Sequence, residues 1–309
     1  MAEIVISEFI TPQALALLER THSVHYDPAL WERPEELAAA LAGARAIVVR
    51  NKTQVRGSVL EAADRLEAVG RLGVGLDNID LDACEARGIK VLPARGANAS
   101  AVAEYVIGAT LLLLRRAFSA TPELVAGHWP REQLIGRQVE GKRLGLLGFG
   151  SIGQVTAGKA RALGMEIAAH DPAIPHDAPC WQTEARRTTF EELIATSDVL
   201  SLHLPLTDET RGLLGGPALA RMKPGAIIVN TARGGIVDEA ALAAALREGR
   251  LAGAALDVFD AEPIDGATGA LFAGLDNVIL TPHIAGVTEE SNARVSEVTA
   301  RNVLDALAG

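Results

Sequence analysis

The sequence predicts an α/β protein built from two doubly wound, parallel-sheet domains. Short apolar runs rich in valine and isoleucine alternate with helix-like stretches along most of the 309 residues, which is the pattern of strands and crossover helices in a parallel sheet. The alternation comes in two series, separated by an irregular segment at residues 93–100. A glycine-rich loop directly follows the apolar run that opens the second series. These observations indicate two sheets, each with helices on both faces.

The composition favours an ordinary globular protein that binds small molecules. With 49% hydrophobic and 22% charged residues, the chain can bury the cores of two domains. The net charge of −10 disfavours nucleic acid and anionic membrane surfaces as partners. Cys84 and Cys180 lie far apart without a CxxC spacing, so neither a disulfide framework nor a metal site is expected.

The N-terminus and the most apolar stretch both predict a cytoplasmic location. The first residues, MAEIVISEF, carry acidic groups where a signal peptide needs a basic segment and then a long apolar one. The apolar stretch 101–114 contains Glu104, and it is shorter than the roughly 20 residues that span a bilayer. We therefore expect a reducing setting, with 101–114 forming a buried or interface helix.

The first series predicts one parallel sheet within the first ninety residues. Its expected strands span 4–6, 23–26, 46–49 and 66–70. Its expected helices span 12–20, 34–41, 58–65 and 81–87. The pattern then breaks at ARGANAS, where Asn98 or Ser100 can cap the long helix that follows. We expect the domain boundary here, after residue 97.

The second series predicts a second sheet. Its expected strands span 144–147, 166–169, 199–203, 226–229, 253–256 and 278–280, and its helices include 154–163 and 239–248. The last stretch offers one helix at about 289–308, too little for a further domain, which we expect to pack back on the first. The domains are therefore expected at 1–97 with 286–309, and at 98–285.

Residues 148–153 read GFGSIG and predict a dinucleotide-binding loop. The motif follows the apolar run 144–147 and precedes a helical stretch, the order that a Rossmann fold requires. Gly148 permits the tight turn, Gly150 lets the backbone approach a pyrophosphate, and Gly153 lets helix and strand pack closely. Strand, loop and helix in this order give the motif more weight than an isolated match.

Asp171 supplies the acidic partner of this loop. It follows Gly153 by 18 residues and comes directly after the next predicted strand, where a carboxylate can accept from both ribose hydroxyls and repels a 2′-phosphate. Taken alone, Asp171 is equally well explained as a turn residue before Pro172. Combined with the glycine loop and the lack of arginine at 172–176, it favours NAD over NADP.

Three polar residues each follow a strand-like run of the second series: Arg233 in TARGGIVDE, Glu262 in DVFDAEP and His283 in TPHIAG. Because the carboxyl ends of parallel strands border the ligand crevice, such residues can converge on one molecule. The guanidinium fork of Arg233 matches a carboxylate, and we expect Gly234 and Gly235 to leave it open space. An arbitrary arginine is more often solvated, but this position favours anion binding.

His283 and Glu262 predict an acid/base pair. Alone, His283 is better explained by packing with satisfied hydrogen bonds, and the alternative for Glu262 is a solvated acidic run with Asp257, Asp260 and Asp265. Paired, the carboxylate holds the imidazole tautomer and raises its pKa, which keeps it active near neutrality. Asp257, at a strand end, is expected to meet the carboxamide side of a nicotinamide ring.

These residues suit hydride transfer between a nicotinamide and C2 of a 2-hydroxy or 2-keto acid. Arg233 would bind the substrate carboxylate and polarise the carbonyl. His283 would protonate the oxygen in reduction and deprotonate the hydroxyl in oxidation. The reaction requires no metal.

Over nearly its whole length the chain resembles the D-2-hydroxyacid dehydrogenases, and within them the catalytic portion of D-3-phosphoglycerate dehydrogenases. The resemblance rests on VVRNKTQV, VGRLGVGLDNIDL, GKRLGLLGFGSIG, NTARGGIVDEAAL, GAALDVFDAEP and TPHIAG. It implies a discontinuous, flavodoxin-like substrate domain, a central Rossmann NAD domain and an active-site cleft between them. It also implies a homodimer formed through the long helix after residue 98, with the region of Trp129 at the interface.

The same resemblance implies the site residues. Its catalytic residues match Arg233, Glu262 and His283. Its cofactor contacts match the glycine loop with Ser151, Ile152, Asp171, Leu204, Pro205, Thr231, Ala232, Asp257, His283 and Gly286, and also Val74, where relatives often carry a polar residue. In the HLPL loop at 203–206 the contacts are expected to come from the backbone.

The substrate is expected to carry a second anionic group. Arg50, Asn51 and Lys52 follow the strand at 46–49, and Val74 and Gly75 follow the strand at 66–70, so they should form the opposite, basic wall of the cleft. For Lys52, as for the nearby Arg71, solvent exposure is an equally good explanation. We rank 3-phosphoglycerate and 3-sulfolactate first, and the chain is also similar to sulfolactate dehydrogenases.

Two alternatives remain open from the sequence. One is a reductase of glyoxylate, hydroxypyruvate or another small 2-keto acid. The other, from a different class, is an NAD-sensing corepressor-like binding protein, because such proteins share this fold and even the catalytic residues. The long regulatory extension of many phosphoglycerate dehydrogenases has no counterpart in these 309 residues, so feedback control by serine is not expected.

Overall fold

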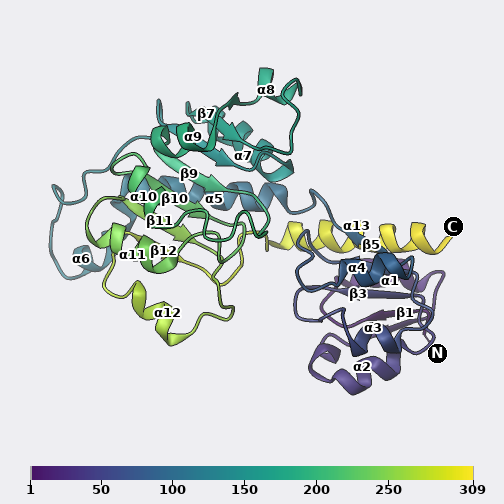
Figure 1. The fold of residues 1–309 in the computed structure, drawn as a ribbon. Helices are drawn as coiled ribbons and strands as arrows, with labels where there is room; N and C mark the ends of the chain where they lie inside the picture. Colours follow the sequence, from purple (N-terminus) through teal and green to yellow (C-terminus); the bar gives the residue numbers. More distant parts are fainter. Residues whose placement is uncertain (1, 309) are drawn as a thin grey trace. The chain divides into compact units, whose positions relative to one another are not determined.

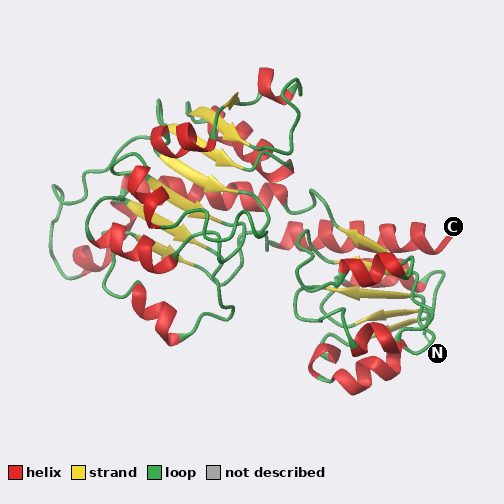
Figure 2. Ribbon diagram, viewed as in Figure 1, coloured by secondary structure: helices red, strands yellow, loops and turns green. Residues whose placement is uncertain are grey.

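The computed structural model describes residues 2–308, which fold as two compact units. Unit 1 consists of the residues up to Asn98 together with those from Val287 onward, and unit 2 is Ala99–Gly286. Each unit contains one sheet whose strands are all parallel, with helices packed around it (Figures 1 and 2). Within the described residues, no helix combines the length and apolarity needed to cross a membrane.

Unit 1 has a five-stranded sheet in the order β2-β1-β3-β4-β5, the flavodoxin-like doubly wound order. Its strands are β1 (Ile4–Ile6), β2 (Val24–Tyr26), β3 (Ala46–Val49), β4 (Ala68–Arg71) and β5 (Lys90–Pro93). Its helices are α1 (Pro12–Glu19), the 3-10 helix η1 (Leu30–Glu32), α2 (Pro34–Leu41), α3 (Ser58–Ala62), α4 (Leu81–Ala86) and the C-terminal α13 (Glu289–Ala308).

Alternating side chains of these strands fill two cores. Ile4 and Ile6 pack with α1 and α13 on one face, while Val5 packs with α2, α3 and α4 on the other. Burial on both faces explains why the strands read as continuous apolar runs. Strand β5 was not predicted, because KVLP contains a lysine and a proline and runs straight into an irregular segment.

Unit 2 has a seven-stranded sheet in the order β12-β11-β10-β9-β6-β7-β8. Its strands are β6 (Arg143–Leu147), β7 (Glu166–His170), β8 (Arg186–Arg187), β9 (Val199–Leu202), β10 (Ile227–Asn230), β11 (Gly253–Leu256) and β12 (Val278–Leu280). Its helices are α5 (Ala99–Arg115), η2 (Ala117–Ser119), α6 (Thr121–Val125), α7 (Ser151–Ala162), α8 (Cys180–Thr183), α9 (Phe190–Thr196), α10 (Gly216–Arg221), α11 (Glu239–Arg247) and α12 (Gly266–Leu271).

The strand order of unit 2 reverses between β6 and β9, which are neighbours in the sheet. From β6 the chain winds outward through β7 and β8, and from β9 it winds the other way through β10, β11 and β12. Ligands of open α/β sheets bind beyond the strand carboxyl ends at such a switch point. The loops after β6 and β9 are therefore the place where a cofactor is expected.

Candidate active site

The glycine loop after β6 has the geometry of a phosphate-binding turn. Gly148 has φ +92°, and a Cβ there would lie 2.5 Å from the His203 carbonyl oxygen. A Cβ on Gly153 would lie 2.7 Å from the Gly148 oxygen, whereas Gly150 faces space with no protein atom within 4 Å of its Cβ position. Two glycines thus fit against protein and the third leaves room for a ligand at the start of α7, where Ser151 and Ile152 form the first turn.

Asp171, directly after β7, is tied to this loop. Its Oδ2 accepts from the Phe149 backbone N–H at 2.8 Å, and its Oδ1 accepts from the Ala173 N–H at 3.0 Å. The turn role that the sequence left open is therefore present in the structure. Since a carboxylate offers about four acceptor positions, the two that remain suit the ribose hydroxyls of NAD.

Two further loops complete this edge of the sheet. The backbone of His203 and Leu204 lies against Gly148, and the Pro205 carbonyl accepts from Thr210, so the 203–206 loop presents backbone toward the glycine loop. After β10, Thr231 Oγ1 is buried without a hydrogen-bond partner among the described residues. An orphaned buried hydroxyl is costly unless a ligand satisfies it, which fits a bound cofactor. NAD, when bound, accepts or supplies the hydride.

The structure joins His283 to Glu262. His283 Nδ1 and Glu262 Oε2 are 2.7 Å apart, and Glu262 Oε1 accepts from the Phe259 N–H at 3.1 Å. Because an ionised carboxylate can only accept, Nδ1 carries the proton of this bond and Nε2 is left for a substrate. The imidazole is 44% exposed, so a substrate can reach it.

Arg233 belongs to the same group of charges. Burial raises the pKa of Glu262, but the hydrogen bond and charge of His283, the Phe259 N–H and the charge of Arg233 outweigh it, and the pKa lies below its usual value. The arginine is thus close enough to Glu262 to act on its ionisation. Its Nη1 donates to the Ala232 carbonyl at 2.6 Å. A cation, an imidazole and a carboxylate are therefore gathered beyond β10, β11 and β12.

The glycines beside Arg233 have a different role from the one expected. A Cβ on Gly234 would lie 1.8 Å from the Phe259 carbonyl oxygen, and on Gly235, which has φ +74°, 2.8 Å from Asp260 Oδ1. Both glycines let the loop after β10 pack against the loop after β11. This close packing accompanies the approach of Arg233 to Glu262.

A second histidine at this edge is unsuited to proton transfer. His203 follows β9, and its Nε2 lies 3.0 Å from Ser201 Oγ. Burial lowers the pKa of His203 to about 4, so the ring is neutral at pH 7 and a poor proton donor. Of the two histidines, only His283 has both exposure and a carboxylate partner.

The predicted residues of unit 1 lie on loops after β3 and β4. Glu8, buried after β1, accepts from four successive N–H groups of the β3 loop: Arg50 at 2.8 Å, Asn51 at 3.2 Å, Lys52 at 3.1 Å and Thr53 at 3.0 Å. The sequence reasoning missed Glu8. Its signal was a carboxylate at the end of an apolar strand, in IVISE.

The loop after β4 is held by its own arginine. Arg71 Nε donates to the Gly75 carbonyl at 2.8 Å and Nη1 donates to the Leu72 carbonyl at 2.6 Å. The loop that carries Val74 therefore folds around this guanidinium. Arg71 thus stabilises the conformation of this loop, a role that differs from the solvent exposure or anion binding considered from the sequence.

Asn230 was also missed, although it directly precedes the TARGG motif. It is 2% exposed; its Nδ2 donates to the Arg233 carbonyl at 2.9 Å and its Oδ1 accepts from the Ala232 N–H at 3.0 Å. A polar residue closing an otherwise apolar strand was the available signal. Asn230 shapes the loop that presents Arg233.

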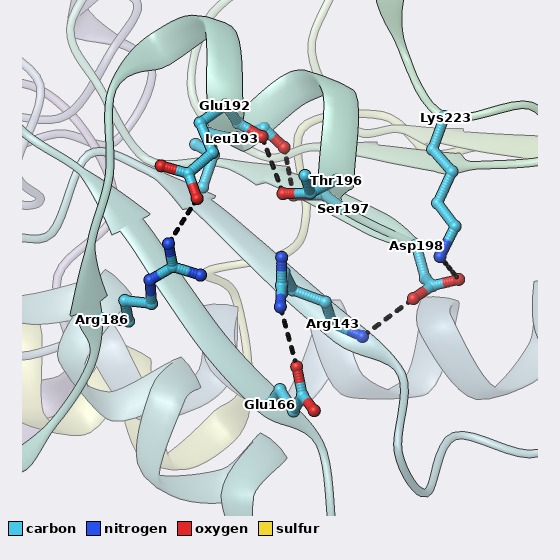
Figure 3. Close-up of polar contacts among 9 residues, drawn as sticks. All are labelled: Arg143, Glu166, Arg186, Glu192, Leu193, Thr196, Ser197, Asp198 and Lys223. Carbon is cyan, nitrogen blue, oxygen red and sulfur yellow. Dashed lines mark hydrogen bonds and ion pairs between the residues drawn. The ribbon is translucent and has the colours of Figure 1, made fainter.

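The opposite, amino edge of the same sheet carries a hollow of about 360 Å³ whose lining includes four charged residues, Arg143, Glu166, Asp198 and Lys223. Figure 3 shows the polar contacts of these residues. Asp198 accepts from the Arg143 N–H at 3.0 Å and from Lys223 Nζ at 2.9 Å, and Arg143 in turn pairs with Glu166 at 3.1 Å. These charges neutralise one another. The hollow also lies at the wrong end of the strands for the glycine loop, so we assign the site to the carboxyl edge.

Comparison with known proteins identifies the family of the chain. Residues 107–285 match the family described as D-isomer specific 2-hydroxyacid dehydrogenase, NAD binding domain. The chain is 50% identical over 307 residues to the (S)-sulfolactate dehydrogenase of Chromohalobacter salexigens, covering 99% of each chain. It is 38% identical over 307 residues to the D-3-phosphoglycerate dehydrogenase of Archaeoglobus fulgidus, covering 99% of this chain and 58% of that one.

A solved structure gives the same result. The D-lactate dehydrogenase of Aquifex aeolicus, crystallised with NAD and lactic acid, superimposes with a TM-score of 0.85 at 29% identity, covering 99% of this chain and 95% of that one. The resemblance first read from the motifs is thereby confirmed, as are NAD as cofactor and oxidoreductase activity. The chain belongs to the NAD-dependent, D-isomer-specific 2-hydroxyacid dehydrogenases.

Proposed function

We propose that this enzyme interconverts a 2-hydroxy acid and its 2-keto acid, and that the substrate carries a second anionic group, with 3-sulfolactate as the first candidate and 3-phosphoglycerate as the second. The observation that carries the proposal is the pair of cationic side chains, Arg50 and Lys52, on a loop whose backbone donors are already occupied by Glu8. The 50% identity to a sulfolactate dehydrogenase over 99% of both chains supports the ranking.

Arg50 is held in a fixed orientation. Its guanidinium hydrogen-bonds Asn292 Oδ1 from α13 and lies 5.9 Å from the centre of the Phe9 ring. Burial lowers the pKa of Arg50, and the charge of Glu8 opposes this; an arginine stays charged in any case. A cation held in place by neighbours loses little conformational freedom when it binds an anion.

Lys52 is supported in a similar way. Its ammonium lies 4.1 Å from the centre of the Trp31 ring, a cation–π distance. With the four backbone N–H groups of the loop taken by Glu8, side chains are left to recognise a sulfonate or phosphate. We propose Arg50, Asn51 and Lys52 as this recognition set, with Val74 and Gly75 lining the substrate through their backbone.

In the chemical step, we propose that Arg233 binds the C1 carboxylate and polarises the C2 oxygen. His283 Nε2 donates a proton to that oxygen in reduction and accepts it in oxidation. Glu262 holds the imidazole by its Nδ1 and stabilises the protonated ring. The same assignment makes the glycine loop, Asp171 and the loops at 203–206, 231–232 and 283–286 the NAD contacts.

The test is an NADH-oxidation assay that compares kcat/KM for sulfopyruvate, phosphohydroxypyruvate, hydroxypyruvate, glyoxylate and pyruvate. We expect the two dianionic substrates to exceed pyruvate by about 100-fold or more, the effect of one desolvated charge pair of about 3 kcal/mol. Equal constants for all five substrates would exclude a site for a second anion. A preference for hydroxypyruvate or glyoxylate would favour the small 2-keto acid reductase instead.

A variant locates the second-anion site. Arg50→Ala should lower kcat/KM for the preferred dianion by about 10- to 100-fold and change that for glyoxylate by less than about threefold. Arg65→Ala, at an exposed position of the same unit, is the matched control and should change neither. Equal losses on both substrates would remove Arg50 from the recognition set.

We also propose that the enzyme is a homodimer that works in the cytoplasm. The segment after α5 exposes large apolar side chains that a monomer would leave in water: Phe118 at 67%, Val125 at 84%, Trp129 at 80% and Ile135 at 74% exposure. Contiguous exposed apolar surface is typical of an interface. Light scattering should give twice the 32.4 kDa chain mass, and Val125→Asp should shift the mass toward the monomer.

A further inference from the structure

Three residues form a hydrogen-bonded chain beneath the His283 loop. Tyr105, from α5, has its hydroxyl 2.6 Å from Thr281 Oγ1. Thr281 Oγ1 donates to Asp257 Oδ1 at 2.6 Å. Asp257 is 1% exposed, and it directly follows β11. The chain thus runs from the middle of a long helix to the carboxyl edge of the sheet.

The direction of each bond is fixed by chemistry. An ionised carboxylate has no proton to donate, so the single hydroxyl proton of Thr281 must point at Asp257. Thr281 can then only accept from Tyr105. Burial raises the pKa of Tyr105, the bond with Thr281 lowers it and the charge of Asp257 raises it, and the pKa ends above its usual value. Tyr105 therefore keeps the proton that this bond requires.

Asp257 also fixes the backbone of the loop that carries His283. Its Oδ1 accepts from the Ile284 N–H and its Oδ2 from the Ala285 N–H, both at 2.8 Å, and its backbone carbonyl accepts from the His283 N–H at 2.8 Å. The backbone between these anchors is unusual, because His283 has φ +52°. A non-glycine residue in the left-handed region is held there by its surroundings.

We propose that Tyr105 and Thr281 are positioning residues for the hydride-transfer reaction. They touch neither Glu262 nor the His283 ring in any bond described above. Instead they hold the Asp257 carboxylate in place. The carboxylate in turn holds the backbone of the His283 loop, which sets the orientation of the imidazole and of its Nε2. With three donors bound, the Asp257 carboxylate has about one acceptor position left. This position suits the nicotinamide carboxamide, so the same carboxylate would orient both His283 and the cofactor.

Substitutions that remove one hydroxyl each test this role. Thr281→Val should lower kcat for keto-acid reduction by about 10- to 100-fold, the scale of a reacting group displaced by about 1 Å, and Thr281→Ser should restore most of it. Tyr105→Phe should lower kcat by about 3- to 10-fold. The KM for the keto acid should stay within about twofold, because the Arg233 loop is untouched.

A matched control lies on the same helix. Thr110, also on α5, is 1% exposed, and its hydroxyl has no hydrogen-bond partner among the described residues. Thr110→Val should therefore leave kcat unchanged. If Thr110→Val lowers kcat as much as Tyr105→Phe does, the loss is a general effect of removing a buried hydroxyl from α5, and the positioning role of Tyr105 is refuted.

The double variant is the sharpest test. Because Tyr105 acts through Thr281, adding Tyr105→Phe to Thr281→Val should lower kcat no further. Additive losses would mean that Tyr105 acts independently of Thr281. If Thr281→Val does not fold, Thr281→Ala, which also lacks the hydroxyl, replaces it, with the same expectation that adding Tyr105→Phe lowers kcat no further. Wild-type kcat in both Tyr105→Phe and a folded Thr281 variant that lacks the hydroxyl would overturn the proposal.

Discussion

The two edges of the unit 2 sheet use similar residues for opposite purposes. At the amino edge, Asp198 is surrounded by partners within the protein, the Arg143 N–H and Lys223. At the carboxyl edge, His283 is bonded through one nitrogen only, Thr231 Oγ1 has no partner among the described residues, and Gly150 faces empty space. The first edge is complete by itself, whereas the second is completed by ligands.

This difference shows why a charged hollow in the surface does not by itself identify a binding site. The amino edge has a hollow of about 360 Å³ with both signs of charge, yet its groups satisfy one another. A binding site instead keeps buried donors or acceptors that only another molecule can satisfy. If this distinction is correct, substitutions at the two edges should separate catalysis from stability.

The largest effect is expected at His283. His283→Gln removes the proposed proton donor, so kcat for keto-acid reduction should fall by about 10³-fold, within the usual range for general acid catalysis. NADH binding, measured by fluorescence, should fall far less than kcat, because the glycine loop and Asp171 are untouched. His22→Gln, at a partly exposed position of unit 1, is the matched control. A His283→Gln enzyme with more than a tenth of the wild-type kcat would rule out this donor.

The next effect is expected at Arg233. Arg233→Lys keeps the positive charge but loses the planar fork, so kcat/KM should fall by about 100-fold. The same exchange at the amino edge, Arg143→Lys, should leave kcat/KM within about twofold, because the guanidinium of Arg143 pairs with Glu166 at that edge and its backbone N–H, which bonds Asp198, is unchanged. Steady-state kinetics of the two variants compares the edges directly. Similar losses in both would contradict the distinction.

A smaller and qualitatively different effect is expected at Glu262. In Glu262→Gln the protonated His283 ring loses the negative charge that faces it at 2.7 Å. The alkaline fall of keto-acid reduction should therefore move to lower pH, with kcat at the acidic plateau reduced by about tenfold at most. The measurement is the pH profile of kcat/KM. A profile that keeps its wild-type position would show that the pair does not govern protonation.

The smallest effect on activity is expected at Asp198. Burial raises its pKa, but the Arg143 N–H and Lys223 outweigh this, so the pKa lies below its usual value. The ionised carboxylate therefore stabilises the fold above the ordinary aspartate pKa, and this contribution is lost as the pH falls through the lowered value. Asp198→Asn should cost about 1 kcal/mol of unfolding free energy at pH 7, and less below about pH 4.

Kinetics and chemical denaturation of Asp198→Asn together test whether Asp198 contributes to stability alone. The kcat and KM values should match those of the wild type, while the denaturation midpoint falls. An activity loss at neutral pH without a loss of stability would mean that the amino edge also takes part in the reaction.

The sequence predicted those parts of the fold that follow from periodicity. Each of the six strands expected in the second series is present to within a residue at either end, since buried parallel strands read as unbroken apolar runs. Strands β5 and β8 were missed for a physical reason. Arg186–Arg187 is two residues long and charged, and it is a strand only because β7 provides a neighbour.

The position of the proposed site residues could be predicted in part. Arg233 and His283 lie at one edge of the sheet, as expected, because topology sends residues that directly follow parallel strands there. Glu8, Asn230 and Tyr105 were not found, because their roles depend on backbone groups and hydroxyls that come close only in the folded chain. Such contacts leave no regular spacing in the sequence.

The buried carboxylate of Glu8 has a consequence for how this enzyme can change. It binds the backbone of the β3 loop rather than any of its side chains, so the loop conformation does not depend on which side chains the loop carries. Residues 50–52 can then be exchanged as a block without refolding their surroundings. If residues 50–52 recognise the substrate as proposed, evolution or an engineer can change the preference for one acid over another at this loop while the proposed catalytic residues of unit 2 stay as they are.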